Sequence, residues 1–312
     1  MQWNQIKTLF ILCFLILDIF LVKQFLDYQN SSALNVIDRS SREEQLEANV
    51  QRLDELPEEA RKDSYIYVRS KRFSEEDIEV LEDQDQEVEA IFNNNILLGE
   101  FEKPIPVNLE SLNADSLESA AIVTENMLYG ENYFYWGKDD VTNTLIFFQK
   151  TEEGKPTYFS QNAVILVFLN EKNEMVQYVQ TALEKVSEDE NKKTLISAYE
   201  AVANIFNAGE PLVDAEITDA KVGYHTFTGL SDELYAFAPS WKITFNNDRY
   251  YIVNALTGYY LPRDNNTFIG DTIDNIQNTV TESKLQTEFL DQFMTDLSLV
   301  LKETGWSEEE GI

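Results

Sequence analysis

Histidine-dependent chemistry has a single candidate residue in this chain. His225 is the only histidine among the 312 residues, and it stands between Tyr224 and Thr226 in a segment with the pattern of a strand. A hydrolase of the serine or cysteine type needs a nucleophile beside such a base. The only cysteine, Cys13, belongs to a hydrophobic segment near the N-terminus. We therefore interpret His225 as a structural residue and expect neither an intramolecular disulfide nor a cysteine metal site.

Carboxylates are too abundant for any one pair to indicate catalysis. The chain has 56 acidic and 24 basic residues, a net charge of -32, so a close pair suited to glycoside hydrolysis is expected by chance. Asp139-Asp140 and the run from Glu82 to Asp85 offer oxygen ligands for calcium, but neither has the spacing of an EF-hand loop. We interpret both as solvated turns. The sequence thus predicts no enzyme, no cofactor and no metal, and its charge excludes nucleic acid as a partner.

A hydrophobic segment near the N-terminus has the length of a membrane span. Residues 6–26 read IKTLFILCFLILDIFLVKQFL, about 31 Å of helix, which is enough to cross a hydrocarbon core. We predict one transmembrane helix, with residues 1–5 in the cytoplasm because of Lys7, and with the remaining domain outside the cell membrane. The alternative is a cleaved signal peptide, because Ser31-Ser32-Ala33 has the small residues that signal peptidase accepts.

Asp18 lies about two thirds of the way along this segment. An ionisable group at such depth costs an isolated helix about 2.5 to 3.5 kcal/mol. One interpretation is that a protonated or snorkelling Asp18 is tolerated; the other is a contact with a second transmembrane helix. On the second interpretation, Asp18, Phe14 and Gln24 are the candidate partner-binding residues of the transmembrane helix.

Hydrophobic periodicity predicts an α+β fold in which helices pack on antiparallel sheets. Two αβββ-like repeats are expected, each with a helix (117–128 and 195–206) ahead of at least three strands. The predicted segments are a juxtamembrane linker (27–40), an N-terminal α+β unit (41–110), the first repeat (111–190), the second repeat (191–262), and a polar linker with a C-terminal amphipathic helix (263–312). Within the N-terminal unit we expect a helix over 41–55, strands over 64–69 and 96–101, and a short helix capped by Ser74.

The strands of the two repeats are predicted from their alternation and turn residues. In the first repeat they span 133–136, 145–149, 163–169 and 175–183, and in the second 215–227, 240–245 and 250–255. The terminal helix shows Leu285, Phe289, Phe293, Leu297 and Val300 on one face. We expect the domain to fold without this helix.

Two segments resemble known families. The opening QWNQIKTLFILCFLILDIFLVKQF resembles the N-terminus of the YycI (WalI) regulatory proteins of low-GC Gram-positive bacteria. The segment APSWKITFNNDRYYIVNALTGYY resembles the hairpin of PepSY-like modules, through Pro239, Trp241, Tyr251, Asn254 and Gly258 in particular. We expect Trp241 and Tyr251 to pack together across that hairpin. The resemblance covers roughly residues 1–262.

The resemblance implies a non-enzymatic, membrane-anchored regulator of a cell-wall-responsive two-component system. Its partners would be a sensor histidine kinase of the WalK (YycG) type and a YycH-type sister protein, contacted partly through the transmembrane helix that contains Asp18. Two alternatives remain, a tethered peptide- or glycan-binding module and a cell-wall hydrolase with an unrecognised site. Asp18 favours the regulator, because a simple tether needs no acid within the membrane.

Overall fold

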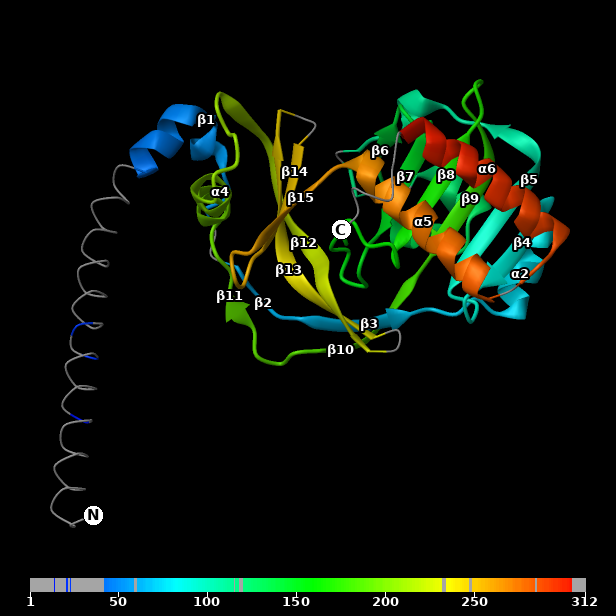
Figure 1. The fold of residues 1–312 in the computed structure, drawn as a ribbon, viewed down its shortest axis with the longest axis horizontal. Coiled ribbons are helices and arrows are strands. Elements are labelled where there is room, and N and C mark those ends of the chain that lie inside the picture. The colour runs from blue at the N-terminus through cyan, green and yellow to red at the C-terminus, as the bar shows by residue number, and fades with distance from the viewer. Residues whose placement is uncertain are drawn as a thin grey trace, which may run out of the picture.

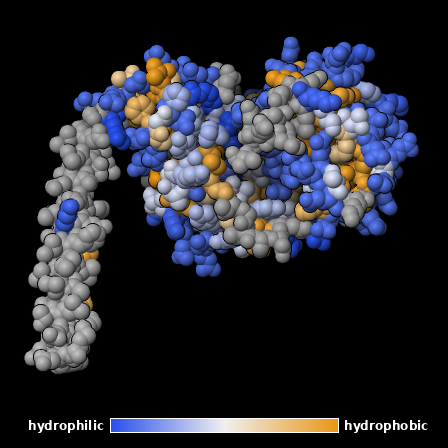
Figure 2. Space-filling model, in the orientation of Figure 1, coloured by the Kyte–Doolittle hydropathy of each residue, from blue (hydrophilic) through white to orange (hydrophobic). Residues whose placement is uncertain are grey.

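The computed structural model describes residues 14, 21, 23, 42–58, 61–114, 116–117, 120–231, 234–246, 249–283 and 285–304. Two large β-sheets lie side by side along the long axis of the domain, with helices packed against them (Figure 1). Hydrophilic residues cover most of the face shown in Figure 2, as expected for a net charge of -32. The α+β class predicted from the sequence is confirmed.

The seven-stranded sheet is built on an antiparallel meander of four strands, β12 to β15. Strand β1 adds to it in parallel beside β12, and β3 pairs antiparallel with both β13 and β10. Its strands are β1 (Val50–Gln51), β3 (Ile66–Ser70), β10 (Leu183–Glu188), β12 (Ala215–Ser231), β13 (Leu234–Phe245), β14 (Arg249–Asn254) and β15 (Tyr260–Arg263). Strands β2 (Lys62–Asp63) and β11 (Lys193–Thr194) form a separate short ladder.

The six-stranded sheet is antiparallel in the order β4-β5-β9-β8-β7-β6. Its strands are β4 (Gln86–Ile91), β5 (Ile96–Pro106), β6 (Tyr133–Asp139), β7 (Thr144–Gln149), β8 (Val164–Leu169) and β9 (Glu174–Thr181). Both faces are buried, since Val164, Leu166 and Phe168 belong to one core cluster while Ile165 and Val167 belong to another. A strand covered on both faces needs no polar alternation, which explains the uninterrupted VILVFL of β8.

Helices cover both faces of the six-stranded sheet and one face of the other. Helices α5 (Asn265–Ser283) and α6 (Glu288–Thr304) pack on one face of the six-stranded sheet, and α2 (Glu75–Glu82) and α3 (Ala121–Asn126) pack on the opposite face. Helix α4 (Ala198–Asn207) and the helix of residues 42–49 share a core with the seven-stranded sheet. Short 3-10 helices span Leu53–Glu55, Leu109–Ser111 and Gly130–Asn132.

Local sequence signals fixed several of these elements. Ser74 and Asp77 form the capping box of α2, which confirms the expected helix start, and Ser197 and Glu200 form that of α4. Helix α3 precedes β6 to β9, and α4 precedes β12 to β15, so each predicted helix is followed by a meander. The strands of the segment 41–110 are divided between the sheets, because β3 joins the seven-stranded sheet while β4 and β5 join the other.

The C-terminal segment differs from the prediction. Residues 265–283 form helix α5 instead of a polar linker, because Phe268, Ile269 and Ile273 are buried against the six-stranded sheet. Phe293 and Leu297 of α6 are fully buried in the same cluster. Helices α5 and α6 are thus part of the core of the six-stranded sheet, which argues against the expectation that the domain folds without this segment. Strands β4 and β15 were not predicted from the sequence either.

The N-terminal predictions are only partly covered by the described residues. The helix predicted over 41–55 ends at Asn49, because Val50 and Gln51 pair with β12 as strand β1; Ser41 lies outside the described residues. Most of the hydrophobic segment 6–26 lies outside them too, including Asp18 and Gln24, while Phe14 is helical and exposed. Within the described residues, no helix combines the length and apolar character needed to cross a bilayer.

Candidate functional site at the junction of the two sheets

The hairpin of β13 and β14 forms the centre of the seven-stranded sheet. Trp241 on β13 is 1% exposed, and its indole Nε1 donates a hydrogen bond of 2.9 Å to the carbonyl of Ile196, just ahead of α4. Strand register places Trp241 opposite Val253 and Tyr251 opposite Ile243. Trp241 and Tyr251 are thus diagonal neighbours on the two strands of the hairpin and belong to one core cluster.

The turn after β14 depends on Asn254 and Gly258. The Asn254 side-chain oxygen accepts from the backbone N–H groups of Leu256 and Thr257, at 2.9 and 3.1 Å. Gly258 has φ +77°, which favours glycine, and an added Cβ would lie 2.4 Å from Asn204 Nδ2 on α4. The Pro239 carbonyl accepts from the N–H of Ala255 at 2.9 Å. These motif residues hold the hairpin against α4, and we assign them a structural role.

A connection between β7 and β8, residues 150–163, fastens the two sheets together and is called the strap below. It forms a parallel bridge with β12, in which Tyr224 N–H donates to the Pro156 carbonyl at 2.8 Å and Tyr158 N–H donates to the Tyr224 carbonyl at 2.9 Å. The close approach requires Gly223, because a Cβ there would lie 2.4 Å from the Pro156 oxygen. The strap therefore links the six-stranded sheet to the seven-stranded sheet.

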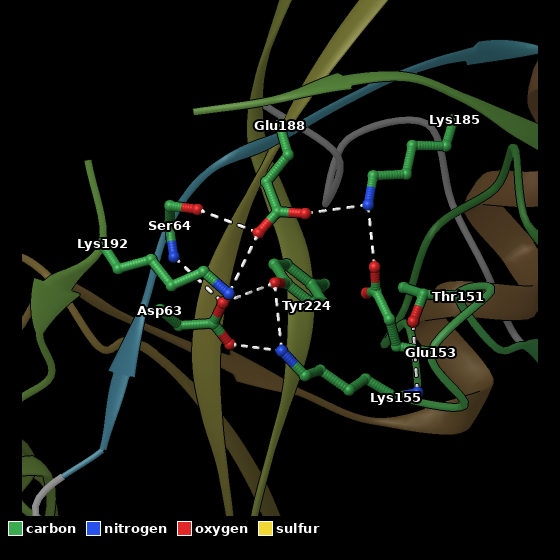
Figure 3. A network of polar contacts seen from close by, with 9 residues as sticks. All are labelled: Asp63, Ser64, Thr151, Glu153, Lys155, Lys185, Glu188, Lys192 and Tyr224. Carbon is green, nitrogen blue, oxygen red and sulfur yellow. Dashed lines mark hydrogen bonds and ion pairs between the residues drawn. The ribbon is translucent and has the colours of Figure 1, made fainter. Parts of the chain in front are cut away.

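A partly buried ion pair lies beside this bridge (Figure 3). Asp63 on β2 is 4% exposed, and its carboxylate accepts from Lys155 Nζ at 2.7 Å, from the Tyr224 hydroxyl at 2.9 Å and from Ser64 N–H at 3.0 Å. A buried charge of this kind is tolerated because it is both paired and hydrogen-bonded. Burial, with Asp63 close by, raises the pKa of the Tyr224 hydroxyl well above its usual value, so the hydroxyl remains a donor.

The network continues across β10 at the surface. Lys185 bridges Glu153 of the strap and Glu188, with 2.8 Å to each carboxylate, and Lys192 lies 3.3 Å from Glu188 (Figure 3). The hydrogen bonds with Glu153 and Glu188 raise the pKa of the Lys185 amine. Sequence reasoning could not find this site, because Asp63 is separated from Lys155 by 92 positions and from Tyr224 by 161.

His225 is buried next to the strap, as the sequence interpretation expected. Its Nδ1 lies 2.7 Å from the Tyr158 carbonyl oxygen, and burial lowers its pKa to about 4. The ring is therefore neutral near pH 7, with Nδ1 as the protonated nitrogen. Among the described residues, neither His225 Nε2 nor the nearby Ser160 Oγ has a hydrogen-bond partner, so the two do not form a nucleophile-base pair.

A family model described as "YycI protein" matches residues 29–256, most of the chain. The chain belongs to the YycI family. The resemblance to the YycI family that the sequence suggested is thereby confirmed. No curated protein sequence matches the chain. A solved structure, the Bacillus megaterium YpeB C-terminal domain, is similar with a TM-score of 0.35 and 12% identity, covering 62% of this chain and all of that domain.

The two acidic runs of this YycI protein differ, because Asp139 is buried, contrary to the expected solvated turn, whereas residues 82–85 are exposed as expected. Asp139 accepts from the N–H and hydroxyl of Thr142, at 2.8 and 2.9 Å, and Asp140 pairs with Lys138 at 2.6 Å. Glu82 and Asp83 end helix α2. Within the part of the chain that the structure describes, no group of three or more His, Cys, Asp or Glu side chains is placed to hold a metal ion.

Acid is expected to destabilise this YycI protein through His225. The unfolded chain binds a proton at the ordinary histidine pKa of about 6.5, whereas the folded chain binds it only near pH 4. The contribution of His225 to folding stability is therefore present above pH 6.5 and is lost as the pH falls toward 4, with a loss on the order of 1 to 2 kcal/mol between pH 6.5 and 5. Urea unfolding measured at several pH values would report this loss, and His225→Gln should remove the slope. A slope that persists in His225→Gln would contradict the assignment.

Proposed function

We propose that this YycI protein is a non-enzymatic regulator of a cell-wall-responsive two-component system. It binds a sensor histidine kinase of the WalK (YycG) type and a YycH-type sister protein. The family match over residues 29–256 carries this proposal, and it agrees with the resemblance of the N-terminal segment. The burial of His225, the lone histidine of the chain, in a neutral form without a nucleophile partner among the described residues also favours a role in binding over hydrolysis.

The proposed location is the cell membrane, with one transmembrane helix over residues 6–26, the N-terminus in the cytoplasm and the α+β domain outside. The apolar composition of this segment supports the anchor. Because the two sheets share the strap and its ion pair, the domain is suited to present a fixed surface to its partners. The transmembrane helix contributes a second contact, in which Asp18, with Phe14 and Gln24 as neighbours in the segment, meets a donor on another helix.

Asp18→Leu is expected to weaken association with the kinase without preventing membrane insertion. Polar contacts between transmembrane helices contribute about 0.6 to 2 kcal/mol, so co-purification should fall by about three- to thirtyfold and signalling output should change. Asp18→Asn should have a smaller effect, because its amide oxygen still accepts a hydrogen bond. Both variants are compared with wild type at matched protein levels in membranes.

Two outcomes would separate the regulator from its alternative. If Asp18→Leu leaves co-purification and signalling unchanged at a normal protein level, the carboxylate is merely tolerated and the proposed transmembrane contact is wrong. If crosslinking in membranes also recovers neither kinase nor sister protein with the wild type, the protein is better explained as a tethered peptide- or glycan-binding module.

A further inference from the structure

A cavity of about 240 Å³ lies where the strap, strand β12 and the start of helix α5 meet. Its wall contains aromatic, hydroxyl, imidazole and charged groups, including those of Phe159, Ser160, His225, Arg263, Phe268 and Asp271. This volume is below the range of about 300 to 1,000 Å³ typical of drug-sized ligands. A ligand of this cavity must therefore be smaller than a drug-sized molecule, about the size of one amino acid.

Two side chains in the wall have polar atoms left without a protein partner. His225 is 1% exposed and Ser160 is 2% exposed, and neither His225 Nε2 nor Ser160 Oγ makes a hydrogen bond to any described residue. Since His225 Nδ1 donates to the Tyr158 carbonyl at 2.7 Å, Nε2 is a bare acceptor. Buried polar atoms in native proteins nearly always have partners. These two are accordingly suited to a ligand that donates to the imidazole and pairs with the hydroxyl.

A residue with a strained backbone also lies in the wall of this cavity. Phe159, between Tyr158 and Ser160, has φ +46°, in the left-handed region that bulky residues avoid. Strain of this kind is found preferentially at ligand-binding loops, where the surrounding structure maintains it. The two unpartnered atoms each expose less than 1 Å², so a ligand could reach them only if strap residues 159–162 shifted slightly. A strained segment is a suitable place for such a shift.

The cavity also contains a cation that matches a carboxylate. Arg263 at the end of β15 is half-buried, and its removal from water lowers the pKa of its guanidinium while Asp271 partly offsets that effect. Guanidinium groups bind carboxylates through two parallel hydrogen bonds, which makes arginine selective for that planar group. Asp264 and Asp271 also line the cavity, so a bound carboxylate must lie on the Arg263 side to avoid their repulsion.

We propose that this cavity binds a carboxylate that stands beside an N–H donor, the pattern of a free amino acid derivative or of a peptide C-terminus. Arg263 and the Ser160 hydroxyl hold the carboxylate, and His225 Nε2 accepts from the N–H. Both unpartnered atoms are thereby satisfied. The inference uses only residues of the cavity and does not depend on the regulatory proposal.

The lone histidine provides a direct test. Full-length protein in detergent micelles, labelled with ¹⁵N-histidine, gives one imidazole Nε2 resonance because the chain contains a single histidine. Titration with N-acetylalanine should shift this resonance saturably, with a Kd of about 1 mM. Alaninamide, which lacks the carboxylate, and acetate, which lacks the N–H, should each bind at least about tenfold more weakly. An N-acetylated tri-alanine peptide that binds more tightly than N-acetylalanine would identify a peptide C-terminus as the ligand, and equal binding would identify a small free acid.

Substitutions of single residues test which side chains bind the ligand. Ser160→Ala and Arg263→Lys should each raise the Kd for N-acetylalanine by about tenfold, whereas Arg69→Lys, an exposed arginine on β3 away from the cavity, should leave it unchanged. The proposal is overturned if the three small compounds act alike, or if Ser160→Ala and Arg263→Lys bind as the wild type does. It is also overturned if the Nε2 resonance shows a hydrogen bond from the outset and ignores every compound, because an ordered water then fills the site.

Discussion

Trp241→Ala is expected to lower the free energy of unfolding by about 3 to 5 kcal/mol, the usual cost of truncating a fully buried aromatic side chain. The indole is 1% exposed and lies in the core formed by α4 and the seven-stranded sheet. Its truncation leaves a cavity and also leaves the Ile196 carbonyl without its donor at 2.9 Å. Urea unfolding followed by circular dichroism would measure the change.

Tyr259→Ala is the matched control for this prediction. Tyr259 is an aromatic residue beside the same hairpin, but it is 58% exposed, so its truncation should cost less than about 1 kcal/mol. If Trp241→Ala and Tyr259→Ala have equal effects, the hairpin is not the packed centre of the sheet. A loss confined to Trp241→Ala would support the burial that the structure describes.

The hairpin was predictable because its signals are local. Alternating apolar residues in β13 and β14, and the polar residues Asn246-Asn247-Asp248 between them, specify two strands and their connection without any distant contact. The capping box of Ser74 and Asp77 likewise identified the start of α2 from neighbouring residues. The exact pairing of Trp241 with Val253 was not predictable, since the register depends on where the turn places its first bonded pair.

Helix α5 shows why the C-terminal segment was misread. Its sequence, NNTFIGDTIDNIQNTVTES, is rich in Asn and Thr and contains a glycine, all of them weak helix formers. It is helical because Phe268, Ile269, Ile273 and Ile276 are buried against the six-stranded sheet. Tertiary packing thus outweighs the low intrinsic helix propensity of the segment. Strand β4 was missed for a related reason, since the charges of QEVEAI obscure its alternation.

The sites described above also differ in whether local sequence signals could predict them. A buried structural His225 could be predicted because one histidine without a nearby nucleophile has few catalytic options. The pairing of Asp63 with Lys155 and Tyr224 could not, because it arises only when the strap reaches the other sheet. The cavity beside His225 also depends on residues from three separate segments. Asp18 is the reverse case, since its sequence context raises a functional question and the residue lies outside the described part of the chain.

A stop codon after Asp264 is expected to abolish cooperative folding of the six-stranded sheet. It removes α5 and α6, and with them a set of core side chains that are at most 6% exposed: Phe268, Ile269, Ile273, Ile276, Leu290, Phe293 and Leu297. Burial of one such side chain contributes about 1.5 to 3 kcal/mol, so the set contributes about 10 to 20 kcal/mol. Whole domains are stable by only about 5 to 15 kcal/mol. Circular dichroism during thermal unfolding, together with binding of a hydrophobic dye, would detect the exposed sheet.

The matched control is a stop codon after Thr304, which keeps both helices and should unfold as the full-length protein does. Because the family match ends at residue 256, the family boundary alone would suggest that a chain ending at Asp264 is complete. The structure leads to the opposite expectation, because Ile146, Phe148 and Leu166 of the sheet would lose the helices that cover them. Cooperative unfolding of the Asp264 truncation at an unchanged midpoint would show that α5 and α6 are dispensable. Loss of cooperativity there, with normal behaviour of the Thr304 truncation, would place both helices within the folding unit.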